Sequence, residues 1–412
     1  MKRMIERCAG LDVHRDTVVA CVRTPDGNGG HHEQVRTFGT FTAGLMELRD
    51  WLLNSGVTLV GMESTGVYWK PVYYVLENAL ECWLLNAAHL HHVPGRKTDI
   101  IDAVWIAQLV AHGLVRPSFV PPRDIRQLRD LTRHRKAVIE ERTREVQRLH
   151  KVLEDAGIKL ASVASKTLTV SGRAMLEALV AGERDPQVLA ELAKGRMRVK
   201  IPQLRQALAG RFNGHHTVIV AEMLARIDHA DDTVARLSAR VAELTVGYAR
   251  QIQLLGTIPG VNQRTAEVIL AEIGADMSRF PDAGHLASWA GMCPGNNESA
   301  GKHHSGRTRK GSKWLRKALV EAAHAAARTK DTYLSAHYAR IRGRQGPRKA
   351  AVAVGHSILV IAYHLLDRDE PYRDLGGDYF IQRQSGQAYQ RRLVAQLEHM
   401  GHRVPALVDC GR

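Results

Sequence analysis

Cysteine is scarce in this 412-residue sequence, and its five copies are scattered. Cys8, Cys21, Cys82, Cys293 and Cys410 form no C-x-x-C pair and follow no regular spacing. This pattern excludes a disulfide scaffold and a zinc site built on paired cysteines. Odd, unpatterned cysteines are typical of reduced thiols in a protein core, so we expect a cytoplasmic protein.

Long apolar runs are also missing. The first eight residues carry three basic side chains and lack the apolar stretch of a signal peptide. No uninterrupted apolar segment reaches the length needed to cross a bilayer. The chain still has 44% hydrophobic residues, enough to fill real cores, and its length predicts two or three modules. We therefore expect a soluble protein without a membrane partner.

Acidic residues are fewest where basic residues are most abundant. Lys and Arg outnumber Asp and Glu by 58 to 42, and residues 301–350 hold fourteen Lys and Arg against only Glu321 and Asp331. Such a local excess predicts a polyanion-binding surface, because a phosphate backbone offsets the self-repulsion. The residues expected to bind nucleic acid are Lys97, Lys302, Arg307, Arg309, Lys310, Lys313, Arg316, Arg342, Arg344, Arg348 and Lys349.

Four carboxylates stand in contexts where an acid is otherwise hard to explain. Asp12 and Glu63 each close an apolar run, and Asp99 and Asp102 lie three apart at the start of a helix-like run, on one face. Strand ends and a helix start can bring distant carboxylates together, where they repel unless a hard cation lies between them. Taken singly, Asp99 could be a helix cap and Glu63 a solvated strand end.

The absence of a His or Cys set around these oxygen ligands favours Mg²⁺, or Mn²⁺, over zinc. Two such ions can hold both the attacking and the leaving oxygen of a phosphodiester. We therefore predict that Asp12, Glu63, Asp99 and Asp102 are catalytic residues that bind two metal ions.

Strand-like and helix-like runs alternate through the first 112 residues. Strands are expected at 8–12, 17–23, 34–38, 59–63 and 82–85, and helices at 42–54, 70–79 and 99–112. Three meandering strands followed by strand–helix alternation predict a mixed α/β sheet with helices on its faces.

The remainder is expected to be mainly helical. Pro121-Pro122 opens a long charged helix to about Asp155, and residues 158–200 are less patterned. The heptad from Met223 to Tyr248 predicts a coiled-coil seam, whose partner is a helix of this chain or, slightly favoured, of another subunit. One short amphipathic helix is expected at about 389–400. The predicted domains are 1–120, 121–250, 251–366 and 367–412.

Three motifs carry a family resemblance: Gly10-Leu-Asp-Val-His, Gly61-Met-Glu-Ser-Thr-Gly and Arg96-Lys-Thr-Asp-Ile-Ile-Asp-Ala. They resemble the DEDD domain of a bacterial insertion-sequence transposase family, RuvC-like RNA-guided enzymes also called bridge recombinases. The resemblance spans about 8–115 and resumes at about 250–365, through Asn297-Glu-Ser-Ala-Gly-Lys and Arg309-Lys-Gly-Ser-Lys-Trp. It implies an RNase H/RuvC-like sheet and a C-terminal transposase domain.

The resemblance also implies a division of labour between the two ends. In that family the serine of the Ser-Ala-Gly-Lys motif attacks DNA and forms a phosphoserine linkage, while the acidic cluster binds metal. By position that serine is Ser299; from the residues alone, Ser305 and Ser312 are equal candidates. Residues 257–266 resemble a helix-hairpin-helix, which offers backbone N–H groups to phosphate. Asn262 replaces its usual second glycine and tolerates the left-handed conformation.

Together these features predict a DNA transposase or recombinase that acts on element ends and target DNA as a homodimer or homotetramer. A guide RNA is implied by the resemblance alone. The nearest alternative is a junction-resolving nuclease in which the acidic cluster activates water. A more distant one is a non-catalytic nucleic-acid-binding protein.

Overall fold

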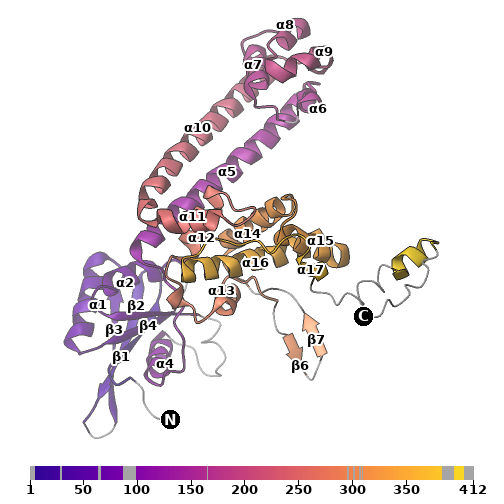
Figure 1. Cartoon of the computed structure of the whole chain (residues 1–412). Helices are drawn as coiled ribbons and strands as arrows, with labels where there is room; N and C mark the ends of the chain where they lie inside the picture. Colours follow the sequence, from indigo (N-terminus) through magenta and orange to yellow (C-terminus); the bar gives the residue numbers. More distant parts are fainter. Residues whose placement is uncertain are drawn as a thin grey trace, which may run out of the picture. The chain divides into compact units, whose positions relative to one another are not determined.

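The computed structural model describes residues 5–27, 30–63, 66–86, 99–164, 166–294, 297–299, 302–305, 308, 310–382 and 394–402. The chain divides into two compact units, unit 1 (residues 1–120) and unit 2 (residues 121–412). Unit 1 is a sheet flanked by helices, and the described part of unit 2 is helical apart from one short hairpin (Figure 1). The divisions expected at 250/251 and 366/367 fall inside unit 2.

Unit 1 contains a five-stranded mixed sheet in the order β3-β2-β1-β4-β5. The strands are β1 (Cys8–Val13), β2 (Thr17–Pro25), β3 (His31–Gly39), β4 (Leu59–Glu63) and β5 (Glu81–Leu85). The first three form an antiparallel meander, and β4 and β5 continue the sheet parallel to β1. The expected mixed α/β sheet is therefore confirmed, and its strand order is consistent with an RNase H-like fold.

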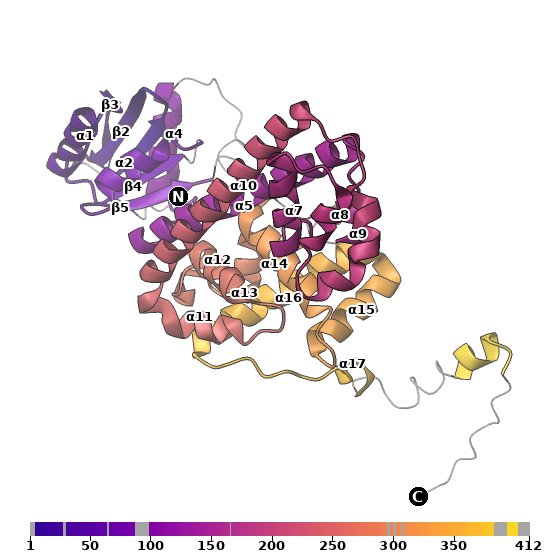
Figure 2. The same cartoon turned by 90° about the horizontal axis from the view of Figure 1, so that it is seen from above.

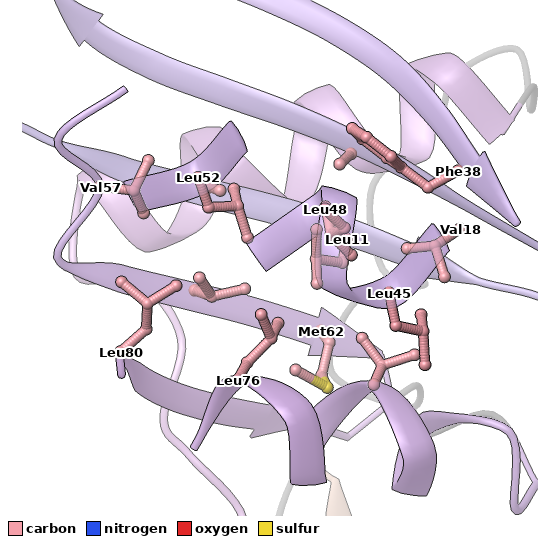
Figure 3. Close-up of a cluster of buried hydrophobic side chains, with 14 of the residues drawn as sticks. Leu11, Val18, Phe38, Leu45, Leu48, Leu52, Val57, Met62, Leu76 and Leu80 are labelled. Carbon is pink, nitrogen blue, oxygen red and sulfur yellow. The ribbon is translucent and has the colours of Figure 1, made fainter. Parts of the chain in front are cut away.

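Helices cover both faces of this sheet (Figure 2). They are α1 (Thr42–Asn54) and α2 (Trp69–Leu76) on one face and α4 (Asp99–Ala111) on the other. Alternation along the strands supplies two cores. Leu11 of β1 and Met62 of β4 are buried with Leu48 of α1 and Leu76 of α2 (Figure 3), whereas Cys8 and Leu59 are buried with residues of α4.

Two glycines allow α4 to approach the sheet closely. Gly10 of β1 and Gly61 of β4 are register partners. A Cβ atom on Gly10 would lie 2.3 Å from both the Ala103 carbonyl oxygen and the Ala107 amide nitrogen, and one on Gly61 would lie 2.5 Å from Val110 Cγ2. At Gly10 the obstacle is backbone, which cannot rotate away, so any larger residue must displace α4.

The cysteines behave as buried thiols in the described residues. Cys8, Cys21, Cys82 and Cys293 form no disulfide; the first two are fully buried and the other two are half-buried. Burial raises the pKa of Cys21 and of Cys82 to about 12 in each case. A thiol with so high a pKa is unreactive at neutral pH, as expected for core cysteines; Cys410 lies outside the described residues.

Unit 2 is built from many helices of very different length. They are α5 (Arg123–Asp155), α6 (Leu160–Val163), α7 (Val170–Val180), α8 (Pro186–Glu191), α9 (Ile201–Leu208), α10 (Gly214–Leu244), α11 (Ala249–Gly256), α12 (Gln263–Ile273), α13 (Ala283–Trp289), α14 (Lys313–Ala326), α15 (Tyr333–Gln345), α16 (Pro347–Arg368) and α17 (Tyr379–Gln382). A two-stranded hairpin, β6 (Asn297–Ser299) and β7 (Lys302–Ser305), precedes α14. Of the helix expected at 389–400, residues 394–399 are helical and 389–393 lie outside the described residues.

The two long helices α5 and α10 lie side by side (Figure 1). Arg142 of α5 donates to both carboxylate oxygens of Asp231 on α10, at 2.5 and 2.8 Å. The heptad residue Ile227 belongs to the same buried cluster as Leu149 of α5. A helix of the same chain therefore covers this part of the heptad face, which is one of the two partners that the pattern allowed.

Helix α16 is the one helix in the described part of the chain that is long and apolar enough, by length and composition, to cross a bilayer. The sequence expectation of no such segment did not foresee it. Half of its apolar window is buried, and it packs against α13, α14 and α15. The core helix of a bundle has these properties without any membrane.

We expect Gly10→Ala to destabilise unit 1 by roughly 1–3 kcal/mol, because the added methyl group overlaps the backbone of α4. Gly39→Ala on β3 is the matched control, since nothing lies within 4 Å of a Cβ built there. Thermal melting followed by circular dichroism checks the difference. Equal melting temperatures for the two variants would show that the contact between α4 and β1 is looser than described.

Candidate active site

Asp12 and Glu63 lie next to each other on the face of the sheet that α4 covers. The register that pairs Gly10 with Gly61 in parallel strands places the residues two positions further on side by side. Because side chains alternate along a strand, those residues share the face of the two glycines. Asp12 and Glu63 therefore point to the α4 side from the carboxyl ends of β1 and β4.

The direction of α4 is fixed by two contacts with the start of the chain. The Ile5 amide donates to the Ala111 carbonyl at 3.1 Å, and Cys8 Sγ donates to the Ala107 carbonyl at 3.5 Å. Moving forward along β1 therefore means moving backward along α4. The helix runs antiparallel to β1, with its first turn toward the carboxyl end of that strand.

The same series continues to the carboxylates. Gly10 abuts Ala103, so two residues of strand correspond to about four of helix, as rises of about 3.3 and 1.5 Å per residue require. The next step, to Asp12, reaches the first residue of α4, which is Asp99. Asp102 follows within the first helical turn. By this extrapolation the first turn of α4 lies toward the strand ends that carry Asp12 and Glu63; the side chain of Asp99 lies outside the described residues.

Asp12 has a neighbour that the sequence analysis quoted but gave no role. Its side chain is only 9% exposed, and its Oδ2 lies 3.1 Å from Nε2 of His14, whose side chain is 41% exposed. At this distance the two side chains form an ion pair when the imidazole is protonated. The signal was available in the motif, because residues two apart on a strand share a face.

The donor set suits a hard divalent cation. It consists of carboxylate oxygens at two parallel strand ends and a helix start, without a cysteine or histidine cluster. Among the side chains that the structure describes, no group of three or more His, Cys, Asp and Glu lies close enough to hold a metal ion. The set of Asp12, Glu63, Asp99 and Asp102 as metal ligands therefore stays a prediction.

We expect wild-type protein to bind Mn²⁺ and Asp12→Asn to bind it at least about tenfold more weakly, because the amide removes the buried charge from the ligand set. The matched control is Asp16→Asn, since Asp16 lies four residues away with its side chain 83% exposed. Isothermal titration with Mn²⁺ measures both. Equal affinities of Asp12→Asn and Asp16→Asn would contradict the assignment.

The second predicted site lies on the hairpin of unit 2. Ser299 ends β6 and is paired with Lys302 of β7. The segments on either side of the hairpin meet at a backbone bridge between Pro294 and Thr308. The side chains of residues 297–299 and 302–305, Ser305 included, lie outside the described part of the chain.

Ser312, a rival nucleophile on sequence grounds, has a structural task. Its Oγ accepts from the Leu315 amide at 3.2 Å as the N-cap of α14 and donates to Oε2 of Glu272 at 2.8 Å. Both hydrogen-bonding functions of the hydroxyl are therefore used within the fold.

The predicted nucleic-acid-binding residues fall into different surroundings. Arg342, Arg344, Arg348 and Lys349 are exposed around the turn between α15 and α16 and, within the described residues, have no carboxylate within 4 Å. Lys310 and Lys313 are also exposed. Arg316 instead donates to the Gly291 carbonyl and to Thr308 Oγ1. The side chains outside the described residues are Lys97, Lys302, Arg307 and Arg309.

Helices α11 and α12 form the expected helix–turn–helix, but with a different turn geometry. Gly260 takes the left-handed conformation, with φ +86°, and a Cβ there would lie 2.4 Å from the Ala322 carbonyl of α14. Asn262 is extended and caps α12, accepting from the Thr265 amide at 2.9 Å. Asn262 therefore does not adopt the left-handed conformation that an asparagine tolerates. Its side chain instead accepts a hydrogen bond from a backbone N–H group that has no partner within the helix.

A second basic surface, absent from the sequence predictions, lies between α8 and α10. Residues 192–221 contain six Lys and Arg and no Asp or Glu. Lys194, Arg196, Arg198 and Lys200 are exposed there. The available signal was this acid-free stretch, which is weaker than the excess of basic residues at 301–350.

Comparison with known proteins gives the same picture at the level of families. Residues 9–158 match the family model of the IS110 DEDD transposase domain, described as a transposase. Residues 252–339 match the model described as transposase, IS116/IS110/IS902 family. Together the two matches span more than half of the chain.

Several curated proteins are similar over most or part of the chain. The pilin gene-inverting proteins of Moraxella bovis and Moraxella lacunata are each 22% identical over 386 residues, which is 88% of this chain and 96% of theirs. The uncharacterized 43.6 kDa protein of insertion element IS110 from Streptomyces coelicolor is 30% identical over 128 residues, 31% of each chain.

The fold, the carboxylate edge and these matches define a DNA transposase, an enzyme of DNA recombination. The chain belongs to the IS110 family of transposases, which confirms the resemblance drawn from its motifs. Its DEDD domain indicates dependence on a divalent metal.

Proposed function

We propose that this transposase cuts and rejoins mobile-element and target DNA through a covalent phosphoserine intermediate at Ser299, with Mg²⁺ held by Asp12, Glu63, Asp99 and Asp102. The observation that carries the metal site is the register of β1, β4 and α4. That register puts two strand-end carboxylates on one face, level with the helix start that bears the other two. Two Mg²⁺ ions, replaceable by Mn²⁺, fit the four ligands.

The chemical step is a transesterification that conserves the phosphodiester. Ser299 Oγ attacks the phosphorus, its proton departs, an Oγ–P bond forms, and one bridging P–O bond of the DNA breaks. The released DNA hydroxyl takes up a proton. Reverse attack by a DNA hydroxyl rejoins a strand without ATP, because bond energy is retained in the phosphoserine. The bound metal would offset charge on the phosphate as it is attacked.

The assignment to Ser299 rests on its place in the Ser-Ala-Gly-Lys motif and on the geometry of its rival. Ser312 is engaged as a helix cap and as a donor to Glu272, whereas Ser299 lies on a hairpin that leaves the helical bundle. Serine is a poor nucleophile unless a base or metal activates it. The metal site of the DEDD domain would supply that activation when DNA is bound.

We expect Ser299→Ala to abolish both the covalent protein–DNA adduct and strand joining, because no other group replaces the attacking oxygen. Ser305→Ala, six residues along the same hairpin, should retain both. Denaturing electrophoresis of labelled element-end DNA with Mg²⁺, followed by mapping of the adduct, measures this. Full strand cutting by Ser299→Ala would instead support a junction-resolving nuclease that uses metal-activated water.

We further propose that the exposed basic turn between α15 and α16 binds the DNA backbone, along with Lys310 and Lys313 and the hairpin cations Lys302, Arg307 and Arg309. Lys97, beside Asp99, would contact the scissile phosphate. The turn also presents the first N–H groups of α16, since Gly346 offers no side-chain cap. The start of α12 would bind phosphate in the manner of a helix-hairpin-helix.

The double variant Arg342→Gln, Arg344→Gln should weaken DNA binding without regard to sequence. Each lost phosphate contact should lower the slope of log K against log salt by about 1. The control is Arg279→Gln, whose guanidinium is 3.3 Å from Asp276 and which should not change the slope. Fluorescence anisotropy at several salt concentrations is the measurement, and an unchanged slope in the double variant would exclude the turn from the DNA interface.

The assembly and the guide remain part of the same proposal. Recombination requires several strand cuts to be held together, so we propose a homodimer or homotetramer acting in the bacterial cytoplasm. A guide RNA follows from the family resemblance, and the basic surfaces suit RNA and DNA backbones equally. The exposed cations at Lys194, Arg196 and Arg198 enlarge the surface available to either.

A further inference from the structure

The hairpin that carries Ser299 is joined to the helical bundle by a neck, which we define as the described residues 291–294, 308 and 310–312. The two sides of the neck meet at the Pro294–Thr308 bridge. They also touch at their base, where a Cβ on Gly311 would lie 2.2 Å from the Ala290 carbonyl oxygen.

Arg316 of α14 holds the neck from one side. Its Nη1 donates to the Gly291 carbonyl at 3.3 Å and to Thr308 Oγ1 at 2.7 Å. One guanidinium nitrogen thus ties the outgoing side of the neck to the returning side. This contact gives Arg316 a role in the fold that does not need DNA.

The Ser312–Glu272 hydrogen bond holds the neck from the other side. Ser312 ends the neck and donates to Glu272 Oε2 at 2.8 Å, and the Glu272 side chain is only 1% exposed. The same carboxylate accepts from Nε and Nη2 of Arg133 at 2.7 and 2.8 Å. Its charge is therefore matched, and its position is set from α5 and not from the neck.

The helix that bears Glu272 is itself anchored to α5. Arg135 donates to Glu267 at 2.6 Å, with both side chains at most 5% exposed. Arg129 donates to the carbonyls of Ala271 and of Glu272 itself, at 3.0 and 2.6 Å, where a cation also complements the end of the helix dipole. Burial lowers the pKa of Arg129 to about 10, which leaves it charged at neutral pH. Glu272 is thus a fixed point.

Capping of α14 does not explain the bond to Glu272. An N-cap needs only an acceptor oxygen, and the Ser312 oxygen already meets the Leu315 amide. The hydroxyl also donates a hydrogen bond to Glu272, a buried carboxylate whose charge Arg133 already neutralises. That second hydrogen bond fixes the angle at which the chain enters α14, and hence the angle of the neck.

We propose that Ser312 and Glu272 are positioning residues of the transposase reaction: their hydrogen bond, with the Arg316–Thr308 contact, sets the neck so that the Ser299 hydroxyl meets the scissile phosphate. The proposal rests on the function proposed above for Ser299. It assigns a task to side chains that touch neither DNA nor metal. A small misplacement of the attacking oxygen is costly, since an error of about 1 Å can lower a rate about a hundredfold.

The test separates the acceptor function of the Ser312 hydroxyl from its donor function. Ser312→Asp keeps an N-cap acceptor but cannot donate, and its carboxylate repels Glu272. We expect its rate of adduct formation on saturating DNA to fall about tenfold to a hundredfold, with the Kd for DNA unchanged within about twofold. Ser312→Thr keeps both halves and should restore the rate. Thr332→Asp, the same change at the N-cap of α15, is the matched control and should react like wild type.

A second contact makes the outcome decisive. Thr308→Val removes the acceptor of Arg316 at a half-buried position and should lower the rate without lowering the melting temperature. Wild-type rates in both Ser312→Asp and Thr308→Val would overturn the proposal.

The failure of this proposal is distinguishable from failure of the proposed function. The adduct of the wild-type enzyme is mapped first. An adduct at a residue other than Ser299 overturns the proposed nucleophile, and with it the purpose given to the neck. An adduct at Ser299 that forms at an unchanged rate in the neck variants overturns the positioning role alone.

Discussion

The direct contact between the backbones of β1 and α4 is the constraint on which the candidate metal site depends. Gly10 and Gly61 remove the side chains that would keep a helix at its usual distance from a sheet. Because α4 then has a single depth and a single register on the strands, its first turn can only lie at the carboxyl end of β1. Asp99, the first residue of α4, therefore lies toward the end of the strand that carries Asp12.

In unit 2, buried ion pairs fix the position of one helix against another. Glu267 and Glu272 of α12 face arginines of α5, and both carboxylates are almost completely buried. Buried ion pairs add little net stability, because desolvation offsets their attraction. They do penalise any arrangement in which one partner is left alone. Their contribution is to fix where α12, and the neck that leans on it, must lie.

Much of this structure follows from local patterns in the sequence. The apolar runs ending at Asp12 and Glu63 are strands, and α4 begins at Asp99 as its pattern indicates. Such features are legible because the hydrophobic period of an element depends only on its own residues. The adjacency of the strands that carry Asp12 and Glu63 is shown as well, since β1 and β4 pair in parallel, whereas the four-carboxylate cluster stays a prediction.

The rest depends on contacts between residues far apart in the chain. Arg129, Arg133 and Arg135 have the sequence of an ordinary charged helix face, yet their partners lie more than 130 residues away. Ser312 reads as one polar residue among many until Glu272 is brought beside it. In the turn between α11 and α12, Gly260 and not Asn262 takes the left-handed conformation. Gly260 lies there against α14, a contact that no hydrophobic period in the sequence reveals.

The anchoring of α5 has a consequence for how such proteins can be divided. The first family match runs to residue 158 and so includes all of α5, whereas the compact unit ends at residue 120. A fragment cut at the family boundary would keep three arginines whose glutamate and carbonyl partners remain on the other piece. The region that matches the family model and the compact structural unit are thus different stretches of chain. Helices α6 to α9 lie outside both matched regions and share a core of their own with the far ends of α5 and α10.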